Sequence, residues 1–361
     1  MEARCEVSLT AISRNYRFFK ERMGSGIVIP VVKANAYGHG AVAVTRHLHR
    51  EEGVRLFAVA TLAEAHQLAE SLPEISILIF TRVFAEELTD LPKNTICTIV
   101  SMEHARSLEQ AASQPVQVHL NVNTGMNRLG LRPEEAIELL KDPDSKLNIT
   151  GLYSHFSSSD TPIDTRYAQQ RIQFRDFVSE ARGQGWSGLV HFSNSAALLH
   201  PEHDCYDAMR LGIGLYGYDT YPGADHQAHL QPAMELKAPL MRVERVQAGE
   251  TVSYAERWCA DRETNIGTLR IGYADGYNRL LTNNAWALSS GKEYPVIGTV
   301  TMDHIMLDLG NDEPEPGTYF TVLGGSASRL EIGAVAERLN TIAYEICCAV
   351  SRRVPRLHLT D

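Results

Sequence analysis

Short apolar runs alternate with amphipathic stretches over the first two thirds of the chain. Eight runs have the length and composition of buried strands, namely residues 27–32, 56–60, 75–80, 95–100, 116–122, 149–154, 189–192 and 206–211. Helical spacing of apolar residues appears between most of them, at residues 41–52, 61–70, 102–112, 134–141 and 165–181, and a short strand (6–9) and a helix (10–22) precede them. Eight strands alternating with helices predict an α/β fold, a (β/α)8 barrel of the TIM type.

The pattern changes after Tyr218. Residues 219–232 are rich in proline, glycine and polar residues, which is typical of a connector. Beyond the connector the chain predicts short strands and one helix, with the strands at residues 240–246, 250–254, 268–272, 294–299, 305–309 and 319–323 and the helix at 332–339. We therefore expect two domains, a barrel over residues 1–225 and a mainly β domain over residues 226–361.

Composition narrows the class of protein. The 361 residues are 44% hydrophobic and 22% charged, as in an ordinary soluble globular protein. A net charge of −10 argues against a nucleic-acid partner. The six cysteines show neither a zinc-binding spacing nor a disulfide framework, so we expect no metal site and a reducing, cytoplasmic environment. No membrane span or signal peptide is visible at the N-terminus, and we expect no membrane partner.

Lys33 closes the first predicted barrel strand, and the glycine-bracketed turn Ala34–Gly40 follows it directly. An ammonium at the end of a buried strand must be paired or partly neutralised, and desolvation lowers its pKa. A neutral lysine amine is a nucleophile that condenses with carbonyls, including the aldehyde of pyridoxal 5'-phosphate (PLP). A structural lysine paired with a carboxylate explains this stretch equally well.

Further polar residues follow other predicted strands. Catalytic groups of such barrels lie in the loops after the strands, where this chain has Arg128, His155, Asn194-Ser195 and Arg210 to Ile213. Each has a structural alternative as an ion-pair partner, a hydrogen-bonding residue or a helix cap, but all fall on one face. Ser195 opens a helix and Gly212-Ile213-Gly214 forms a tight turn, and both features suit a phosphate. A lysine with phosphate-binding turns favours PLP over a lysine-based aldolase.

Several stretches together resemble alanine racemases over nearly the full length of the chain. They are Val32–Gly40, Asn123–Gly130, Tyr153–Phe156, Ser193–Ala196, Arg210–Gly217, Val252–Tyr254, Ile271–Gly276 and Met302-Asp303. The resemblance implies a PLP-binding barrel followed by a β domain, with residues 1–9 forming a strand that joins the second domain. It also implies a homodimer in which each active site is completed by the partner subunit.

The resemblance implies a two-base racemisation of L- and D-alanine through an external PLP aldimine. Lys33 would hold PLP as an internal aldimine and then act as one base, and Tyr254 of the partner subunit would act as the other. A phenol normally titrates near ~10, so Tyr254 would need the neighbours that the family supplies at His155 and Arg210. Arg210 would face the pyridine nitrogen, where a guanidinium cannot accept a proton, and this would suppress side reactions.

The remaining roles follow from the same resemblance. Cofactor contacts, mainly to the phosphate, would come from Tyr37, Asn194, Ser195, Gly212, Ile213 and Tyr344. Arg128 would lie near the PLP phenolic oxygen and orient the substrate carboxylate, a task suited to a bidentate fork. The backbone of Met302 would complete the carboxylate site, with Asp303 beside it. Residues along a narrow access channel would be Asp160, Tyr273, Arg279 and Tyr344.

Three positions depart from the family pattern. Asn121 stands where many members carry a carbamylated lysine, so Arg128 would be held by the amide or by a bound anion such as chloride. Thr301 stands where cysteine or serine is common, and Thr299 where many members have an arginine.

The expected function is therefore alanine racemisation, which in bacteria supplies D-alanine for peptidoglycan. A racemase acting on serine or a broader set of amino acids is the first alternative. A non-catalytic PLP-binding homeostasis protein is a second, but such proteins lack the β domain that carries Tyr254 and Met302. A fold-related decarboxylase is disfavoured by Arg210.

Overall fold

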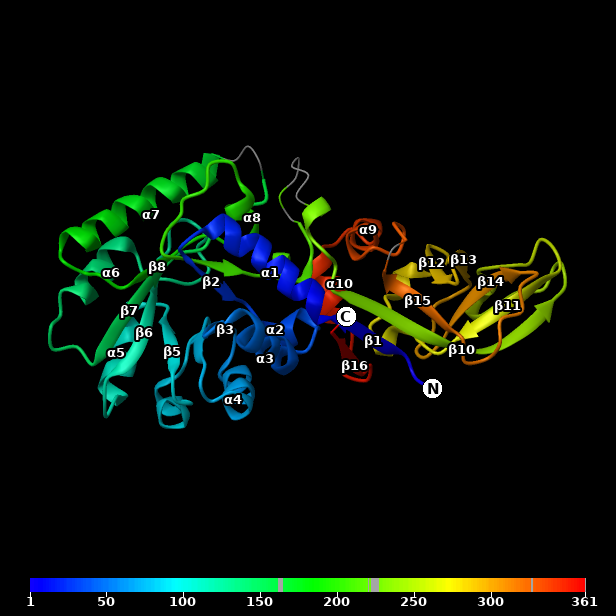
Figure 1. The fold of residues 1–361 in the computed structure, drawn as a ribbon, viewed down its shortest axis with the longest axis horizontal. Coiled ribbons are helices and arrows are strands. Elements are labelled where there is room, and N and C mark those ends of the chain that lie inside the picture. The colour runs from blue at the N-terminus through cyan, green and yellow to red at the C-terminus, as the bar shows by residue number, and fades with distance from the viewer. Residues whose placement is uncertain (162–164, 220, 222–226, 326, 361) are drawn as a thin grey trace. The chain divides into compact units, whose positions relative to one another are not determined.

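A computed structural model describes residues 1–161, 165–219, 221, 227–325 and 327–360 (Figure 1). The chain forms two compact units. One contains residues 11–36 and 41–231, and the other contains residues 1–10, 37–40 and 232–361. The expected domain boundary at residues 225 and 226 and part of the expected connector lie outside the described residues. No helix of the described residues combines the length and the apolar character that crossing a membrane requires.

The larger unit is built on a parallel eight-stranded sheet. Its strands are β2 (Ile27–Pro30), β3 (Leu56–Val59), β4 (Ser76–Ile79), β5 (Thr95–Ile99), β6 (Val116–Asn121), β7 (Leu147–Tyr153), β8 (Leu189–His191) and β9 (Ala208–Leu211). The spatial order is β2-β9-β8-β7-β6-β5-β4-β3. A parallel bridge between Val31 and Ala58 joins the two ends of this order, so the sheet closes into a barrel.

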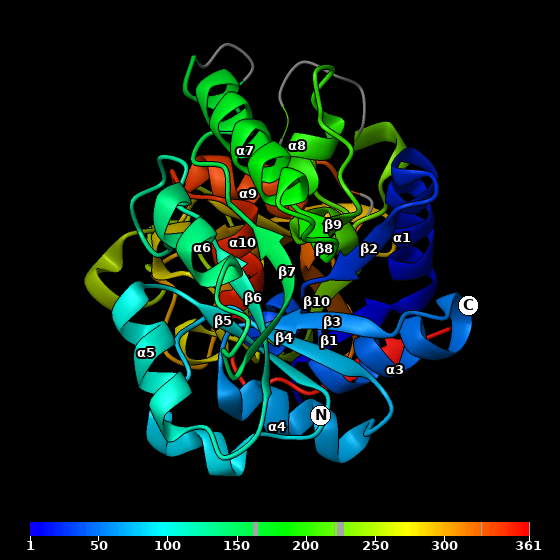
Figure 2. The ribbon, with the colours of Figure 1, turned by 90° about the vertical axis from the view of Figure 1, so that its left-hand side faces the viewer.

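Helices surround this barrel (Figure 2). They are α1 (Leu9–Met23), α3 (Ala41–Glu52), α4 (Leu62–Ser71), α5 (Met102–Ala111), α6 (Pro133–Leu140) and α7 (Thr165–Gly183), with the short helices α2 (Lys33–Tyr37) and α8 (Ser195–Leu199) and the 3-10 turns η1 (Ala85–Asp90), η2 (Ile213–Tyr216) and η3 (Gln227–His229). The local sequence determines where several of these helices begin. Thr61 and Glu64 form a capping box on α4, Ser101 caps α5, and Pro133 begins α6. The predicted fold class, an α/β barrel followed by a mainly β domain, is confirmed.

The barrel strands are buried on both faces, as parallel strands covered by helices must be. All three residues 57–59 in β3 and 77–79 in β4 are buried, and all of β5 is buried. The polar side chains in this apolar interior include His119, Tyr153, His191 and Arg210. Each is at most 4% exposed, so each must find its hydrogen-bond partners inside the protein.

The smaller unit is organised around a second eight-stranded sheet, in the order β11-β14-β13-β12-β15-β10-β1-β16. The strands are β1 (Arg4–Ser8), β10 (Met234–Val246), β11 (Thr264–Leu269), β12 (Ala285–Ser289), β13 (Lys292–Ile297), β14 (Ile305–Gly310), β15 (Tyr319–Gly324) and β16 (Arg356–Leu359). It also contains α9 (Ile332–Arg338), α10 (Ala343–Ala349), η4 (Tyr254–Glu256), η5 (Tyr273–Asp275) and η6 (Arg279–Leu281). The N-terminal strand β1 pairs antiparallel with β10 and parallel with β16.

Some predicted elements of this unit are wrong. Residues 250–254 form no strand, because Thr251 makes only an isolated bridge to Cys259 and Ser253 has φ +70°, a conformation that a strand cannot accommodate. The strand predicted at 268–272 lies at Thr264–Leu269. The strands β12 and β16 and the helix α10 were not predicted. They are short, and short elements depend on their tertiary partners more than on their own composition.

Candidate active site

The backbone after Lys33 adopts a left-handed helical turn. Ala34, Asn35 and Ala36 have φ between 51° and 55° and ψ between 47° and 51°. Left-handed helical geometry costs L-residues about 1–2 kcal/mol each, and such strain persists only where the surroundings enforce it. Lys33 itself is half-buried at the end of β2, beside the Val31–Ala58 bridge that closes the barrel.

The other barrel residues expected at the site also follow the strands. Arg128 is exposed in the loop after β6, and His155 is half-buried in the loop after β7. Asn194 and Ser195 begin α8 after β8, and Arg210 lies on β9, ahead of Gly212 and Ile213. Because the carboxyl ends of parallel barrel strands meet at one face, these residues share that face with Lys33. Asp160 is exposed in the loop after β7.

Arg210 is the most heavily bonded of these residues. Its guanidinium, in a side chain 3% exposed, donates to the backbone carbonyls of Ser154 (2.7 Å), Phe192 (3.0 Å) and His191 (3.1 Å). It also donates to Nδ1 of His191 (2.9 Å) and Nδ1 of His155 (3.1 Å). Burial lowers the pKa of Arg210 to about 10, so the guanidinium stays charged at neutral pH.

These bonds fix the protonation of three histidines. A guanidinium can only donate, so Nδ1 of His155 and Nδ1 of His191 must both be unprotonated acceptors. His191 then carries its proton on Nε2 and donates to Nδ1 of His119 (2.9 Å). Burial, with Arg210 nearby, lowers the pKa of His155 and of His119 to about 3 and that of His191 well below its ordinary value. All three imidazoles are therefore neutral at physiological pH.

Cations from three strand ends act on His155. After burial, the pKa of this imidazole is lowered by Arg210, then by Arg128 and then by Lys33. The three positive charges come from the ends of β9, β6 and β2 respectively. This end of the barrel is therefore electropositive, and it suits a ligand that carries negative charge.

Ser195 and the turn after β9 form a second polar group. The Ser195 hydroxyl oxygen, in a residue 4% exposed, accepts from the backbone N–H of Gly212 (3.1 Å) and of Gly214 (3.3 Å). Asn194 caps α8 by accepting from the N–H of Ala197 (2.9 Å), and its amide donates to the hydroxyl of Ser159 (2.9 Å). Backbone N–H groups and a buried hydroxyl thus converge between β8 and β9.

A buried glutamine connects the loops that carry Arg128 and His155. Gln170 of α7, 2% exposed, donates to the carbonyl of His155 (3.0 Å) and to the hydroxyl of Thr124 (3.3 Å), at the start of the loop that leads to Arg128. Its carbonyl oxygen accepts from the N–H and the hydroxyl of Ser157, both at 3.0 Å. The two loops are therefore held to one helix.

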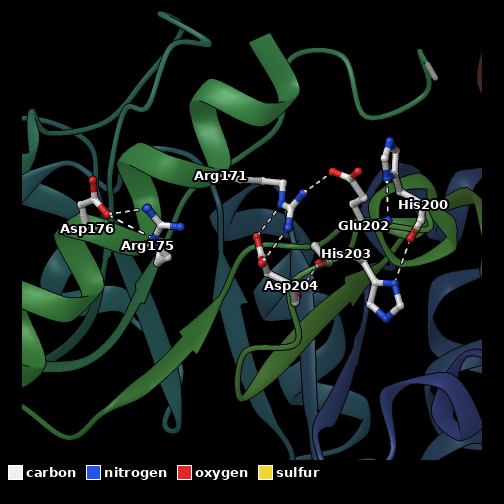
Figure 3. Close-up of polar contacts among 8 residues, drawn as sticks. Arg171, Arg175, Asp176, His200, Glu202, His203 and Asp204 are labelled. Carbon is white, nitrogen blue, oxygen red and sulfur yellow. Dashed lines mark hydrogen bonds and ion pairs between the residues drawn. The ribbon is translucent and has the colours of Figure 1, made fainter. Parts of the chain in front are cut away.

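An ion-pair cluster anchors the segment between α8 and β9 to the same helix (Figure 3). The guanidinium of Arg171 forms two bonds with Asp204 (2.7 and 3.0 Å) and one with Glu202 (3.1 Å). His203 and His200 close a local turn, in which Nδ1 of His203 lies 2.9 Å from the carbonyl oxygen of His200. This segment leads directly into the strand that carries Arg210.

Tyr254 lies in the smaller unit, on the η4 turn, with 72% of its surface exposed. The turn is strained, since Ser253, Ala255 and Glu256 all have positive φ. Thr299, 2% exposed, donates its hydroxyl to the carbonyl of Tyr254 (2.7 Å), and its own carbonyl accepts from the Ser253 hydroxyl (2.8 Å). The threonine at this departure from the family pattern therefore holds the backbone of Tyr254.

The loop of Met302 packs on a second turn of the same unit. The N–H groups of Tyr273 and Ala274 donate to the carbonyls of Thr301 (3.0 Å) and Met302 (3.1 Å). Arg353 then bridges Asp303 (2.9 Å) and Asp275 (3.2 Å), one carboxylate from each turn. The side chains of Met302 and Tyr273 remain 52% and 43% exposed.

The remaining expected residues of the smaller unit are Tyr37, Tyr344 and Arg279. The rings of Tyr37 and Tyr344 lie 5.8 Å apart, and burial raises the pKa of Tyr37 far above its ordinary value. The Tyr37 phenol is therefore protonated at neutral pH. Arg279 begins η6 and is exposed.

Gly272 offers a test of the Met302 loop. A Cβ at this position would lie 2.3 Å from the Met302 carbonyl oxygen and 2.4 Å from that of Thr301. We therefore expect Gly272→Ala to displace the loop, to lower the free energy of unfolding by about 1–3 kcal/mol and to reduce turnover. Urea unfolding and steady-state rates measure both effects.

Gly183→Ala is the matched control for this substitution. Gly183 ends α7, and a Cβ there meets nothing within 4 Å, so this variant should be at least as stable as the parent. Equal stability and turnover in the two alanine variants would show that the Met302 loop tolerates displacement.

Sequence reasoning did not identify several residues that support the site. His119 and His191 lie inside strands that were predicted as apolar runs, and a polar residue within such a run was the available signal. Gln170 gave no signal of its own, because its partners are distant along the chain. Thr299 was noted only as a departure from the family pattern, and its contact with the backbone of Tyr254 was not foreseen. For Glu64, the Thr61–Glu64 spacing of a capping box was the available signal, and that spacing points only to the start of a helix.

Comparison with known proteins places both units in one family. The chain matches the model of the alanine racemase N-terminal domain over residues 7–220 and that of the C-terminal domain over residues 233–358. It is 38% identical over 344 residues to the alanine racemase of Chlorobaculum tepidum, which covers 91% of this chain and 88% of that protein. It is 37% identical over 374 residues to alanine racemase 2 of Bacillus subtilis, covering 99% and 94% of the two chains.

Solved structures of the family are also similar. The alanine racemase of Clostridium difficile 630 matches with a TM-score of 0.92 and 30% identity, covering 100% of this chain and 96% of that one. The alanine racemase of Bartonella henselae, described with covalently bound pyridoxal phosphate, matches with a TM-score of 0.88 and 27% identity, covering 99% and 100%.

Proposed function

This chain belongs to the alanine racemase family, and from that premise we propose which of its residues carry out the reaction. The enzyme is a PLP-dependent isomerase that interconverts L-alanine and D-alanine. The observation that carries the assignment of its site is the convergence of Lys33, Arg128 and Arg210 on His155 at one end of the barrel.

The residues at this end fit PLP. The cofactor presents an aldehyde, a doubly negative phosphate and an aromatic ring. Lys33 offers an amine for the aldehyde. The Ser195 oxygen accepts from the N–H groups of Gly212 and Gly214, which leaves its hydroxyl hydrogen to be donated to the phosphate. We propose that Asn194, Ile213 and the Tyr37–Tyr344 pair complete this group. The positive charge around His155 favours an anionic ligand.

Racemisation needs one proton acceptor on each face of the α-carbon. When bound, PLP supplies the electron sink that stabilises the carbanion formed by loss of the α-proton. We propose that the Lys33 amine takes or returns the proton on one face and that the Tyr254 phenol of the partner subunit does so on the other. His155 is neutral, with its proton on Nε2, so this imidazole can donate a hydrogen bond to a phenolate oxygen and help Tyr254 to lose its proton.

Arg210 controls the outcome of the reaction in this proposal. Its pKa of about 10 keeps the guanidinium charged at neutral pH, and its five bonds to neutral acceptors hold it in place. A positively charged group that only donates hydrogen bonds disfavours protonation of a neighbouring ring nitrogen, and an unprotonated ring is a poorer electron sink. Such a neighbour favours rapid return of the α-proton over side reactions.

We propose that the enzyme is a homodimer with shared active sites. Tyr254, Tyr273 and Met302 expose large side chains on strained or tightly held turns, and exposed aromatic and methionine side chains are typical of interfaces. In the dimer, Arg128 and the backbone of the partner's Met302 loop would hold the alanine carboxylate, with Asp303 fixing that loop through Arg353. Asp160, Tyr273 and Arg279 would line the access channel.

We further propose that the enzyme works in the cytoplasm. Cys5, Cys97, Cys205 and Cys259 carry free thiols, and thiols persist in a reducing compartment.

Exchange of the α-proton tests the function directly. Purified protein with added PLP is incubated in D2O with L-alanine, D-alanine or L-serine in separate samples, and deuterium at the α-carbon is followed together with the enantiomeric ratio. We expect exchange with inversion from either enantiomer of alanine and a slower reaction with serine. Apolar pockets reject an added hydroxyl only weakly, so some serine turnover is expected.

Two results would change the assignment. Faster inversion of serine than of alanine would make the chain a serine or broad-specificity racemase. An absorbance band from bound PLP without any exchange would favour a non-catalytic PLP-binding protein.

A further inference from the structure

We propose that Glu64 is a positioning residue, which holds the left-handed turn Ala34–Ala36 and thereby fixes the direction in which the Lys33 side chain leaves the barrel. The inference rests on the proposed role of Lys33. It concerns a residue on α4, which follows the neighbouring strand β3 and which has no part in the chemistry described above.

The left-handed turn needs external support. Ala34–Ala36, and Tyr37 after them, have positive φ, a conformation that normally occurs singly and mainly in glycine. The N–H of Ala36 donates to the carbonyl of Val32 (2.8 Å), and the side chain of Asn35 accepts from the N–H of Ala41 (2.9 Å). These two bonds tie the middle and the end of the turn to its own chain. The residue directly after Lys33 is held by a more distant group.

That group is the carboxylate of Glu64. Its Oε1 accepts from the N–H of Ala34 at 2.6 Å, a short distance that is typical of a charge-assisted bond. Because Ala34 follows Lys33 in the chain, this bond fixes the peptide plane between the two residues. The direction of the Lys33 Cα–Cβ bond depends on that plane.

The second oxygen of Glu64 has a separate task. Oε2 accepts from the N–H of Ala60 (2.8 Å) and from the N–H of Thr61 (3.1 Å), while the Thr61 hydroxyl accepts from the N–H of Glu64 (3.3 Å). This is the capping box of α4. One carboxylate therefore joins the end of β3 to the turn after β2, next to the bridge that closes the barrel.

Oε1 of Glu64 accepts from one N–H group and Oε2 from two. A substitution can therefore separate support of the turn from capping of the helix. In Glu64→Gln, one oxygen is replaced by an NH2 group, which cannot accept a hydrogen bond. The amide should turn its oxygen toward the two donors at Ala60 and Thr61 and its NH2 toward the single donor at Ala34. The substitution should release the turn and keep the helix cap. Thr61→Ala is the complementary variant, because it weakens the cap and leaves Oε1 on Ala34.

Two measurements on the full-length chain decide the matter. Hydrogen–deuterium exchange of peptides that span residues 33–36 is followed by mass spectrometry in the cofactor-free protein. PLP affinity is measured by titration of absorbance. A hydrogen bond to a charged acceptor contributes about 10-fold or more to an equilibrium. We expect Glu64→Gln to speed exchange in this peptide about 10-fold and to weaken PLP binding by a similar factor.

Thr61→Ala should lower the unfolding temperature and change neither exchange in that peptide nor PLP affinity by more than about 2-fold. Unchanged exchange in Glu64→Gln would overturn the proposal, and so would equal effects of the two variants on both readouts. Faster exchange with unaltered PLP affinity would show that Glu64 holds the turn but does not position Lys33. If the parent protein bound no PLP, the proposed function would fail, whereas the exchange measurement would still decide whether Glu64 holds the turn.

Discussion

Replacing Lys33 by alanine is expected to lower alanine racemisation by at least about 10⁴-fold in both directions. Removing a group that acts both as a nucleophile and as a general base costs about this much or more, because each role alone contributes orders of magnitude. The lysine lies at the end of β2, on the face where Arg128, His155 and Arg210 also lie. In the proposed site, no other side chain supplies an amine there.

The measurement is steady-state racemisation from L-alanine and from D-alanine, together with absorbance of bound PLP and the unfolding temperature. Lys93→Ala is the control, because Lys93 is an exposed lysine of the same unit. Its removal should leave the rate within 2-fold, since substitutions of exposed side chains usually have effects of roughly 0.5 kcal/mol or less. A Lys33→Ala protein that is folded and keeps more than about 1% of the parent rate, far above the level expected for loss of such a group, would exclude Lys33 as the essential residue.

Acidification from pH 7 to pH 5 is expected to destabilise the barrel strongly. In the folded state, His119 and His155 have pKa values of about 3 and His191 has a pKa well below its ordinary value, whereas in the unfolded chain each titrates near ~6.5. Below pH ~6.5 the unfolded chain therefore binds protons that the folded chain excludes. Above pH ~6.5 the contribution of these histidines to the free energy of unfolding is complete. It is lost progressively as the pH falls toward their pKa values in the folded state.

The size of the effect follows from the same linkage. For each histidine that stays neutral in the folded state, the free energy of unfolding falls by about 2 kcal/mol between pH 7 and pH 5, so the three together lower it by about 6 kcal/mol. His104 on α5 contributes in the same direction, because burial lowers its pKa as well. Most carboxylates titrate near or below pH ~4.3, so this window mainly reports the histidines.

Urea unfolding at a series of pH values measures this slope. In His119→Asn the slope should fall by about one third, since one of the three main titrating groups is gone. The exposed His304 provides the control, and His304→Gln should leave the slope unchanged. A free energy of unfolding that does not vary between pH 7 and pH 5 would mean that these imidazoles bind protons as readily in the folded state as in the unfolded chain.

Much of the architecture could be predicted because it follows from the local pattern of apolar and polar residues. All eight barrel strands lie where the apolar runs predict them, and α3 spans the predicted residues 41–52. The loops after those strands could be identified as the proposed place of the chemistry, since parallel strands direct their carboxyl ends to one face. Prediction failed mainly in the smaller unit, where residues 250–254 look like a strand but form a strained turn.

The supporting contacts of the site could not be predicted. Arg210 and His155 were visible as polar residues at strand ends, but His191 and His119 read as members of apolar strands. The tautomers of these two histidines depend on the Arg210 guanidinium, which can only donate. They also depend on the packing that places Arg210, His191 and His119 within hydrogen-bond distance. Those distances join residues from β6, β8 and β9, and no local pattern encodes them.

The amino-acid sequence alone is enough to predict the periodicity of the strands and helices, the order of the two units and the position of Lys33 at a strand end. These features follow from side-chain size and polarity over a few neighbouring residues, which a single stretch of chain contains. The left-handed turn at Ala34–Ala36, the bond from this turn to Glu64 and the neutral state of His119, His155 and His191 arise from the folded chain. Backbone strain and shifted pKa values arise from burial and from partners distant in sequence, so they exist only once the chain has folded.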